Sequence, residues 1–156
     1  MNKTLGFWFE KILSYGMGIL TFYICNNYWQ KLIFLKDTDF LDKIISITST
    51  LFGFLLAVLT LLLQSSSVTI EKMKKHGSFL KLIYLNKLIV LTSIINCILS
   101  FFLFFSMKLI CEKSEKILKI LTSLNFSLLS FVLINTLLFT ILFYQIIISD
   151  EKKTSS

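Results

Sequence analysis

The sequence contains no proline and no arginine, and only 16% of its 156 residues are charged. Soluble domains of this size have about 25% charged residues, so the low charged fraction argues against an ordinary soluble enzyme. Without arginine the chain lacks the side chain that forms bidentate hydrogen bonds with phosphate and carboxylate groups. An arginine-based voltage sensor is excluded for the same reason. The exclusive use of lysine is also typical of an AT-rich bacterial genome.

Residues that carry chemistry are equally scarce. The chain has three cysteines, without a C-x-x-C pair, and the single histidine His76. It contains no G-x-S-x-G, H-E-x-x-H or glycine-rich phosphate-binding motif. These absences predict no disulfide framework, no metal site, no cofactor and no enzymatic activity.

Hydrophobic residues are abundant instead, at 55% of the chain, with 16 phenylalanines and a mean hydropathy of +0.79. A helix that crosses a bilayer needs roughly 20 mostly apolar residues. Four runs approach this length and leave only short connections between them. The sequence therefore predicts an all-α integral membrane protein, a four-transmembrane-helix bundle in a single membrane domain (1–156). Its spans lie at about 12–28, 44–63, 88–107 and 120–143.

The distribution of lysines predicts the orientation of these spans, because lysine-rich connections stay on the cytoplasmic side. With four spans, the N-terminal segment, the 64–87 connection and the C-terminal tail share one side and hold more lysines than the other side. Both termini are therefore expected in the cytoplasm. If 12–28 merely lay in the membrane interface, the count would reverse. The compact cluster around Lys74 favours a cytoplasmic 64–87 connection.

Small and polar residues gather on one sector of about 100° in the second span. At its centre, Ser49, Gly53 and Ala57 form a small-x-x-x-small ladder, which lets another helix backbone approach closely. We name the ladder face by its members: Ser46, Ser49, Gly53, Ala57, Thr60 and Gln64. Three partners remain open for this face: another helix of the same bundle, a second copy of the chain, or a water-filled pore.

Uncharged polar residues also lie deep in the later spans, notably Asn96, Asn125, Asn135 and Thr136. Lipid offers no hydrogen bonds, so these groups need partners on neighbouring helices or in a wet conduit. The runs 44–63, 88–107 and 120–143 contain no Asp, Glu, Lys, Arg or His. Because such groups mark proton relays and ion coupling, a proton-coupled transporter is disfavoured.

The 64–87 connection is the most basic segment and includes Lys72, Lys74, Lys75 and Lys81. Without arginine or interleaved aromatic residues, attraction to anionic lipid headgroups is a simpler explanation than nucleic-acid binding. We expect the lipid bilayer to be a partner, and no direct contact with nucleic acid.

Residues 50–64 (TLFGFLLAVLTLLLQ) and 71–83 (EKMKKHGSFLKLI) carry a resemblance to a known group of proteins. Their small residues, leucines and Lys/Gly-Ser-Phe connection resemble small multi-pass membrane effectors of bacterial anti-phage systems, of the retron-associated type. The resemblance implies a protein that damages or depolarises the host membrane when a partner senses infection. It supplies no catalytic residues.

These observations lead to one expected function and one alternative. We expect an inner-membrane, multi-pass effector that forms a homo-oligomer and perturbs or permeabilises the membrane when a soluble partner from the same operon triggers it. The alternative is a non-conducting membrane anchor or assembly subunit, or a bacteriocin-immunity-type membrane protein. A small transporter or membrane enzyme is disfavoured by the lack of charge within the spans.

Overall fold

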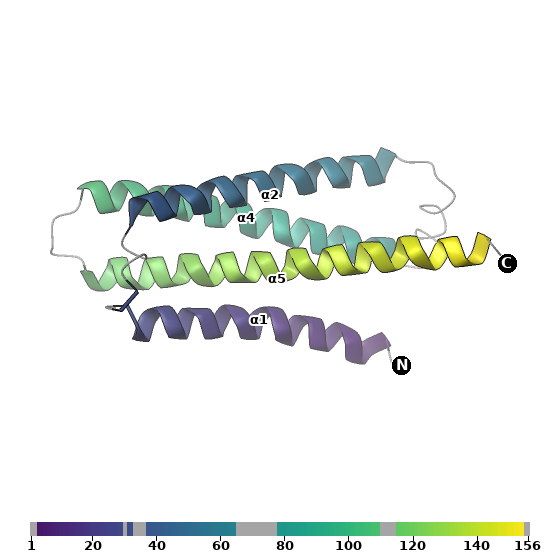
Figure 1. Cartoon of the computed structure of the whole chain (residues 1–156), viewed down its shortest axis with the longest axis horizontal. Helices are drawn as coiled ribbons and strands as arrows, with labels where there is room; N and C mark the ends of the chain where they lie inside the picture. The colour runs from purple at the N-terminus through teal and green to yellow at the C-terminus, as the bar shows by residue number, and fades with distance from the viewer. Residues whose placement is uncertain (1–2, 30, 33–36, 65–77, 110–114, 155–156) are drawn as a thin grey trace.

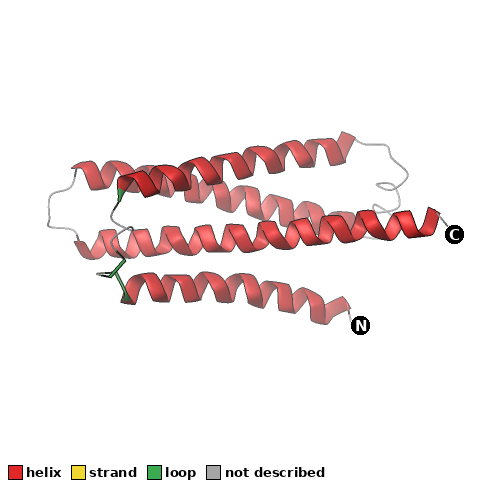
Figure 2. Cartoon of the chain, in the orientation of Figure 1, coloured by secondary structure: helices red, strands yellow, loops and turns green. Residues whose placement is uncertain are grey.

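A computed structural model describes residues 3–29, 31–32, 37–64, 78–109 and 115–154 of the chain. These residues form helices and short turns, as Figures 1 and 2 show. The helices are α1 (Lys3–Asn27), α2 (Thr38–Gln64), α4 (Ser78–Leu109) and α5 (Glu115–Thr154). The predicted all-α class is confirmed for this part of the chain.

Helices α2, α4 and α5 each contain one predicted apolar run and extend beyond it, whereas α1 covers the run 12–28 except its last residue. The longest, α5, has 40 residues and, at 1.5 Å per residue, is about 60 Å long. That length exceeds a hydrocarbon core of about 30 Å, so α5 must tilt or protrude if it crosses a bilayer. At the start of α2, the Asp37 carboxylate accepts a hydrogen bond from the backbone N–H of Asp39 at 3.0 Å, which caps that helix.

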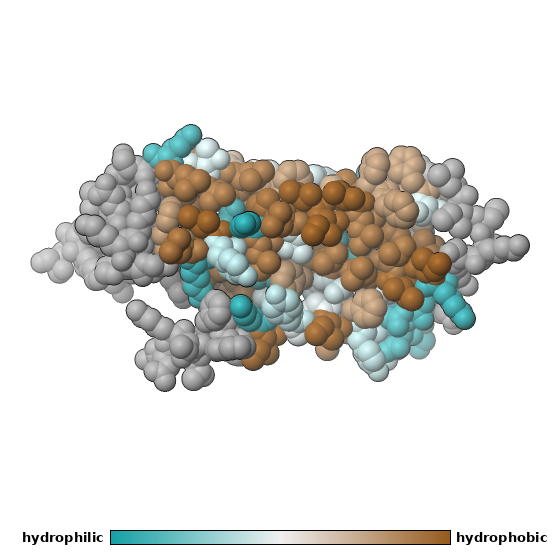
Figure 3. All heavy atoms as spheres, turned by 180° about the vertical axis from the view of Figure 1, so that it is seen from behind, coloured by the Kyte–Doolittle hydropathy of each residue, from teal (hydrophilic) through white to brown (hydrophobic). Residues whose placement is uncertain are grey.

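Three helical segments among the described residues are long and apolar enough to cross a membrane: Thr38–Gln64, Phe79–Met107 and Lys116–Tyr144. Helix α1 is not one of them. Many large hydrophobic side chains on these segments face outward, including Phe54, Leu61 and Phe102, each more than 60% exposed. Figure 3 shows one side of the bundle, where hydrophobic residues cover most of the described surface between the two ends. Such a surface suits lipid and not water.

The helices run side by side in alternating directions (Figure 1). Helix α4 packs against both α2 and α5, and α1 packs against α5. Both chain termini lie at the same end of the bundle, where α2 ends and α4 begins. The predicted 64–87 connection therefore joins helices at the end that carries the termini.

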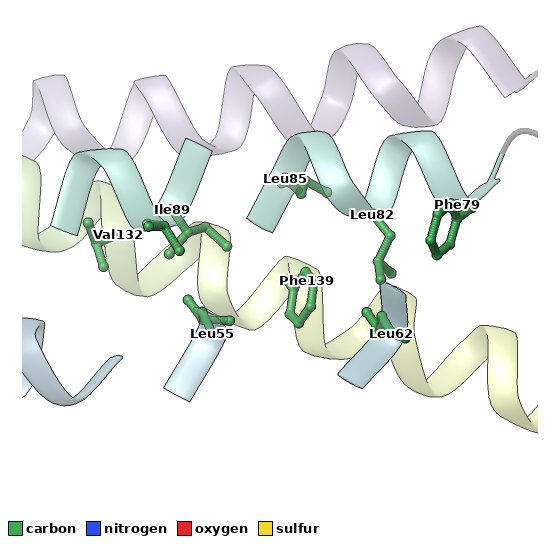
Figure 4. Packing of buried hydrophobic residues seen from close by; sticks show 9 residues of the cluster. Leu55, Leu62, Phe79, Leu82, Leu85, Ile89, Val132 and Phe139 are labelled. Carbon is green, nitrogen blue, oxygen red and sulfur yellow. The ribbon is translucent and has the colours of Figure 1, made fainter. Parts of the chain in front are cut away.

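The main apolar core lies where α2, α4 and α5 meet. Figure 4 shows its side chains pointing toward one another from the three helices. The core residues with less than 7% exposure include Leu55, Leu62, Leu82, Ile89, Val132 and Phe139. On α2 the buried residues recur at alternating three- and four-residue steps, with half-buried ones between them. This spacing is the packing pattern of a left-handed coiled coil.

Candidate functional site

The buried face of α4 is unusual because polar residues are interspersed with apolar ones along it. Successive members follow the same three- and four-residue steps, and each is at most 1% exposed: Leu82, Asn86, Ile89, Ser93, Asn96, Ser100 and Leu103. On α5, Thr122 and Asn125 are also fully buried. We call the six polar members the polar seam: Asn86, Ser93, Asn96 and Ser100 of α4 with Thr122 and Asn125 of α5.

The centre of the polar seam joins α4 to α5. The Asn125 amide nitrogen donates to Ser100 Oγ at 2.6 Å and to the Asn96 backbone carbonyl at 3.3 Å. The Ser100 hydroxyl donates in turn to the Asn96 carbonyl at 2.8 Å. Hydrogen bonds of this kind between membrane helices stabilise association by about 0.6–2 kcal/mol each.

A second bond of the polar seam joins α4 to α2. The Asn86 amide nitrogen donates to the Leu55 backbone carbonyl at 3.0 Å. This carbonyl belongs to the turn of α2 that also supplies the buried Leu55 side chain to the apolar core. Asn86 therefore fixes the register of α4 on α2.

Several other polar atoms in this region are buried without a hydrogen-bond partner in the described part of the chain. In the polar seam they are Asn86 Oδ1, Ser93 Oγ, both side-chain polar atoms of Asn96, Thr122 Oγ1 and Asn125 Oδ1. An unpartnered buried polar group costs about 1–3 kcal/mol in a protein interior. The helices thus bury polar groups in an arrangement that leaves much of their hydrogen-bonding capacity unused.

Polar contacts join helix α1 to α5. The Ser14 hydroxyl donates to Asn135 Oδ1 at 3.2 Å, and the Ser127 hydroxyl donates to the Gly18 carbonyl at 2.8 Å. A Cβ atom added at Gly18 would lie 3.5 Å from Ser127 Oγ. The close backbone approach of two helices thus occurs at Gly18, and not at the predicted Gly53.

The ladder face of α2 points away from its own bundle. Ser46, Gly53, Ala57, Thr60 and Gln64 are exposed, and Ser49 is half-buried. Apart from the neighbouring backbone of α2 itself, no described atom lies within 4 Å of a Cβ added at Gly53. The hydroxyls of Ser49 and Thr60 donate only to carbonyls of their own helix. The structure therefore shows no packing of this face against another described part of the chain, and the face is compatible with packing on a second copy or with lining a pore.

The four predicted intramembrane polar residues have different surroundings. Asn135 has a partner on a neighbouring helix, as expected, and its amide nitrogen also donates to the Phe131 carbonyl at 2.8 Å. Thr136 bonds the carbonyl of Val132 in its own helix. Asn125 bridges α5 to α4. The Asn96 side-chain amide has no hydrogen-bond partner among the described residues, so a bond from it to a neighbouring helix is not seen there.

Of the basic residues predicted in the 64–87 connection, Lys81 lies in the first turns of α4 and is half-buried. The remaining three, Lys72, Lys74 and Lys75, lie outside the described residues. The described residues also contain no group of three or more His, Cys, Asp or Glu side chains close enough to hold a metal ion.

Asn86, Ser93 and Ser100 were not predicted as members of a polar site. They share one buried face with Asn96, at spacings of three, four and seven residues. A search for this heptad pattern along 78–109 would have found them. The chemical capacity of the polar seam is limited to hydrogen bonding, because its amides and hydroxyls do not titrate near neutral pH.

No family model, curated protein or solved structure matches the chain. The helices alone define the class of protein, an all-helical chain whose long apolar segments fit a membrane.

Proposed function

We propose that this chain is a four-span protein of the bacterial inner membrane that assembles into homo-oligomers and perturbs or permeabilises that membrane. A separate soluble partner, encoded in the same operon, triggers it in anti-phage defence. The outward-facing ladder of α2 is the observation that carries the proposal. It offers a helix surface suited to close packing, and no described part of the same chain occupies it.

The fourth span in this proposal is α1. It lies along α5 in the opposite direction (Figure 1) and is bonded to α5 through Ser14 and Gly18. If α5 crosses the bilayer, α1 also crosses it, because α1 lies alongside α5 over its 25 residues. The termini are placed in the cytoplasm, since Lys72, Lys74 and Lys75 belong to the connection at that end.

The polar seam supports the permeabilising activity. Its unpartnered amides and hydroxyls are poorly satisfied in the closed bundle. A separation of α4 from α5 would let water reach these atoms and offset part of the cost of opening. A lining of uncharged polar groups passes ions without the fixed charge needed for coupled transport.

A membrane-potential assay tests the proposal. The chain is expressed from a tight promoter together with its operon partners, and a potential-sensitive dye is read before and after phage infection. We expect depolarisation after the trigger and none in cells that carry the empty vector. An unchanged potential under infection, with every partner gene present, contradicts the proposal.

Growth during overexpression provides a second readout. An effector slows growth when it accumulates or is triggered, whereas an anchor or immunity protein is harmless. Harmless accumulation together with protection against a membrane-active bacteriocin would establish the immunity alternative instead.

A further inference from the structure

A cleft opens between α1 and α4, and α5 forms its floor. It is an open groove and not an enclosed cavity, and its space of about 450 Å³ includes the part open to the surroundings. Each helix contributes residues from one face, including pairs three and four positions apart. The cleft lies apart from the polar seam and from the ladder face, so neither of the features discussed above explains it.

The charged groups among the described lining residues of the cleft are both lysines. Lys11 of α1 and Lys81 of α4 both line it, and both side chains are half-buried. Each lysine lies one helical turn before the tyrosine that its own helix contributes, Tyr15 or Tyr84. Because α1 and α4 begin at the same end of the bundle (Figure 1), both ammonium groups belong to the part of the cleft nearer that end.

The wall becomes apolar toward the middle of the bundle. Leu88 of α4 and Phe131 of α5 line this part. The Tyr15 ring packs against Phe131 with the ring centroids 5.2 Å apart. Tyr15 and Tyr84 are each 55% exposed, which suits tyrosine at the boundary between lipid headgroups and acyl chains.

We propose that this cleft binds an anionic glycerophospholipid, with its phosphate between Lys11 and Lys81 and an acyl chain along Leu88 and Phe131. The cleft is cationic near the starts of α1 and α4 and apolar further in. An amphiphile matches this arrangement when its anionic headgroup lies at the lysines and its acyl chain lies along the apolar wall. A free phosphate ion would satisfy the lysines and leave the apolar wall unused. Basic pockets between membrane helices bind anionic headgroups in this way. The inference requires a membrane location but does not require the effector function.

Lipid binding to the purified full-length protein in neutral detergent tests the proposal. Native mass spectrometry compares phosphatidylglycerol, phosphatidylcholine with the same acyl chains, and inorganic phosphate. We expect phosphatidylglycerol to bind about tenfold more tightly than phosphatidylcholine. Equal affinity for the two lipids overturns the proposal. Displacement of phosphatidylglycerol by an equal concentration of inorganic phosphate overturns it in favour of a small-anion site.

Variants locate the site. The Lys11→Gln/Lys81→Gln pair should lower the affinity for phosphatidylglycerol to that for phosphatidylcholine. The matched Lys43→Gln/Lys116→Gln pair removes the same charge from exposed lysines near the starts of α2 and α5, at the other end of the bundle, and should change nothing. Lys11→Arg/Lys81→Arg keeps the charge and should keep the preference, which separates loss of charge from loss of fold. Equal loss in the glutamine pair and its matched control overturns the assignment to this cleft.

Discussion

Asn96 and Asn125 lie next to each other on α4 and α5, yet their amides have different surroundings. The Asn125 nitrogen donates to two acceptors on α4. The Asn96 amide is buried with neither of its polar atoms bonded among the described residues. The two side chains should therefore respond with opposite signs to the same substitution.

Asn96→Leu should raise the free energy of unfolding by about 1–3 kcal/mol, because it removes an unsatisfied buried amide. Asn125→Leu should lower it by about 1–2 kcal/mol, since it breaks the link to Ser100 and Asn96. Both are measured by unfolding in mixed detergent micelles. Loss of stability in both variants would mean that the Asn96 amide has a partner.

The Asn96→Leu variant also separates the effect on stability from the effect on function. If wetting of the polar seam accompanies permeabilisation, Asn96→Leu should reduce depolarisation although it stabilises the fold. Thr140→Val is a suitable control, because Thr140 is exposed and bonds only to its own helix.

At the scale of residues, the sequence predicted which side chains are polar and lie within apolar runs. It could not predict which of them have partners, because a hydrogen bond between helices depends on the register of two segments far apart in the chain. Asn135 accepts a hydrogen bond from Ser14, which lies 121 positions earlier in the chain. The side-chain amide of Asn96 has no described partner.

The attachment of α1 to α5 depends on a close approach at one turn. Gly18 is buried, and its carbonyl accepts a bond from Ser127. A methyl group fits there at ordinary contact distance, since the nearest atom would be 3.5 Å away. A longer side chain does not fit without moving the helices apart.

Gly18→Ala should change the free energy of unfolding by no more than about 1 kcal/mol. Gly18→Leu should lower the free energy of unfolding by about 1–3 kcal/mol through overpacking and loosen α1 from α5. Proteolysis of α1 in detergent reports the loosening. Gly16→Leu is the matched control, because no described atom lies within 4 Å of a Cβ added there. Equal proteolysis of α1 in the Gly18→Leu and Gly16→Leu variants would contradict the docking of α1 on α5 at Gly18.

At the scale of elements, the apolar runs predicted each of the described helices, because continuous hydrophobic sequence forms helix in a membrane environment. The packed face of α2 could not be predicted in the same way. Its ladder and its buried leucines lie on opposite faces, and both are compatible with helix packing. Between helices in lipid there is no hydrophobic force to choose one of them.

Assembly of whole chains is the property that the ladder face should control. Gly53→Leu should leave the fold of one chain unchanged, since no described atom lies near that position. It should prevent homo-oligomer formation by blocking close backbone approach. Chemical cross-linking in membranes measures assembly. The matched Gly16→Leu variant should assemble normally, and normal assembly of Gly53→Leu would make the ladder face lipid-exposed.

The position of Cys111 tests the topology of the whole molecule. It belongs to the connection between α4 and α5, at the end opposite the termini, so the four-span arrangement places it outside the cytoplasm. An impermeant thiol reagent should label it in intact cells, and Cys111→Ser should abolish the labelling. Labelling only after lysis would indicate the inverted arrangement with three spans.

The sequence by itself determined that the chain is helical and suited to a membrane, because both properties follow from local runs of apolar residues without charge. It also determined the small-residue ladder of α2. Only the tertiary structure decided that α1 docks on α5 at Gly18 and that the ladder faces outward. It also decided that α4 buries its amides and hydroxyls against α2 and α5. These features depend on how distant helices are paired, and a one-dimensional pattern of polarity is equally compatible with other pairings.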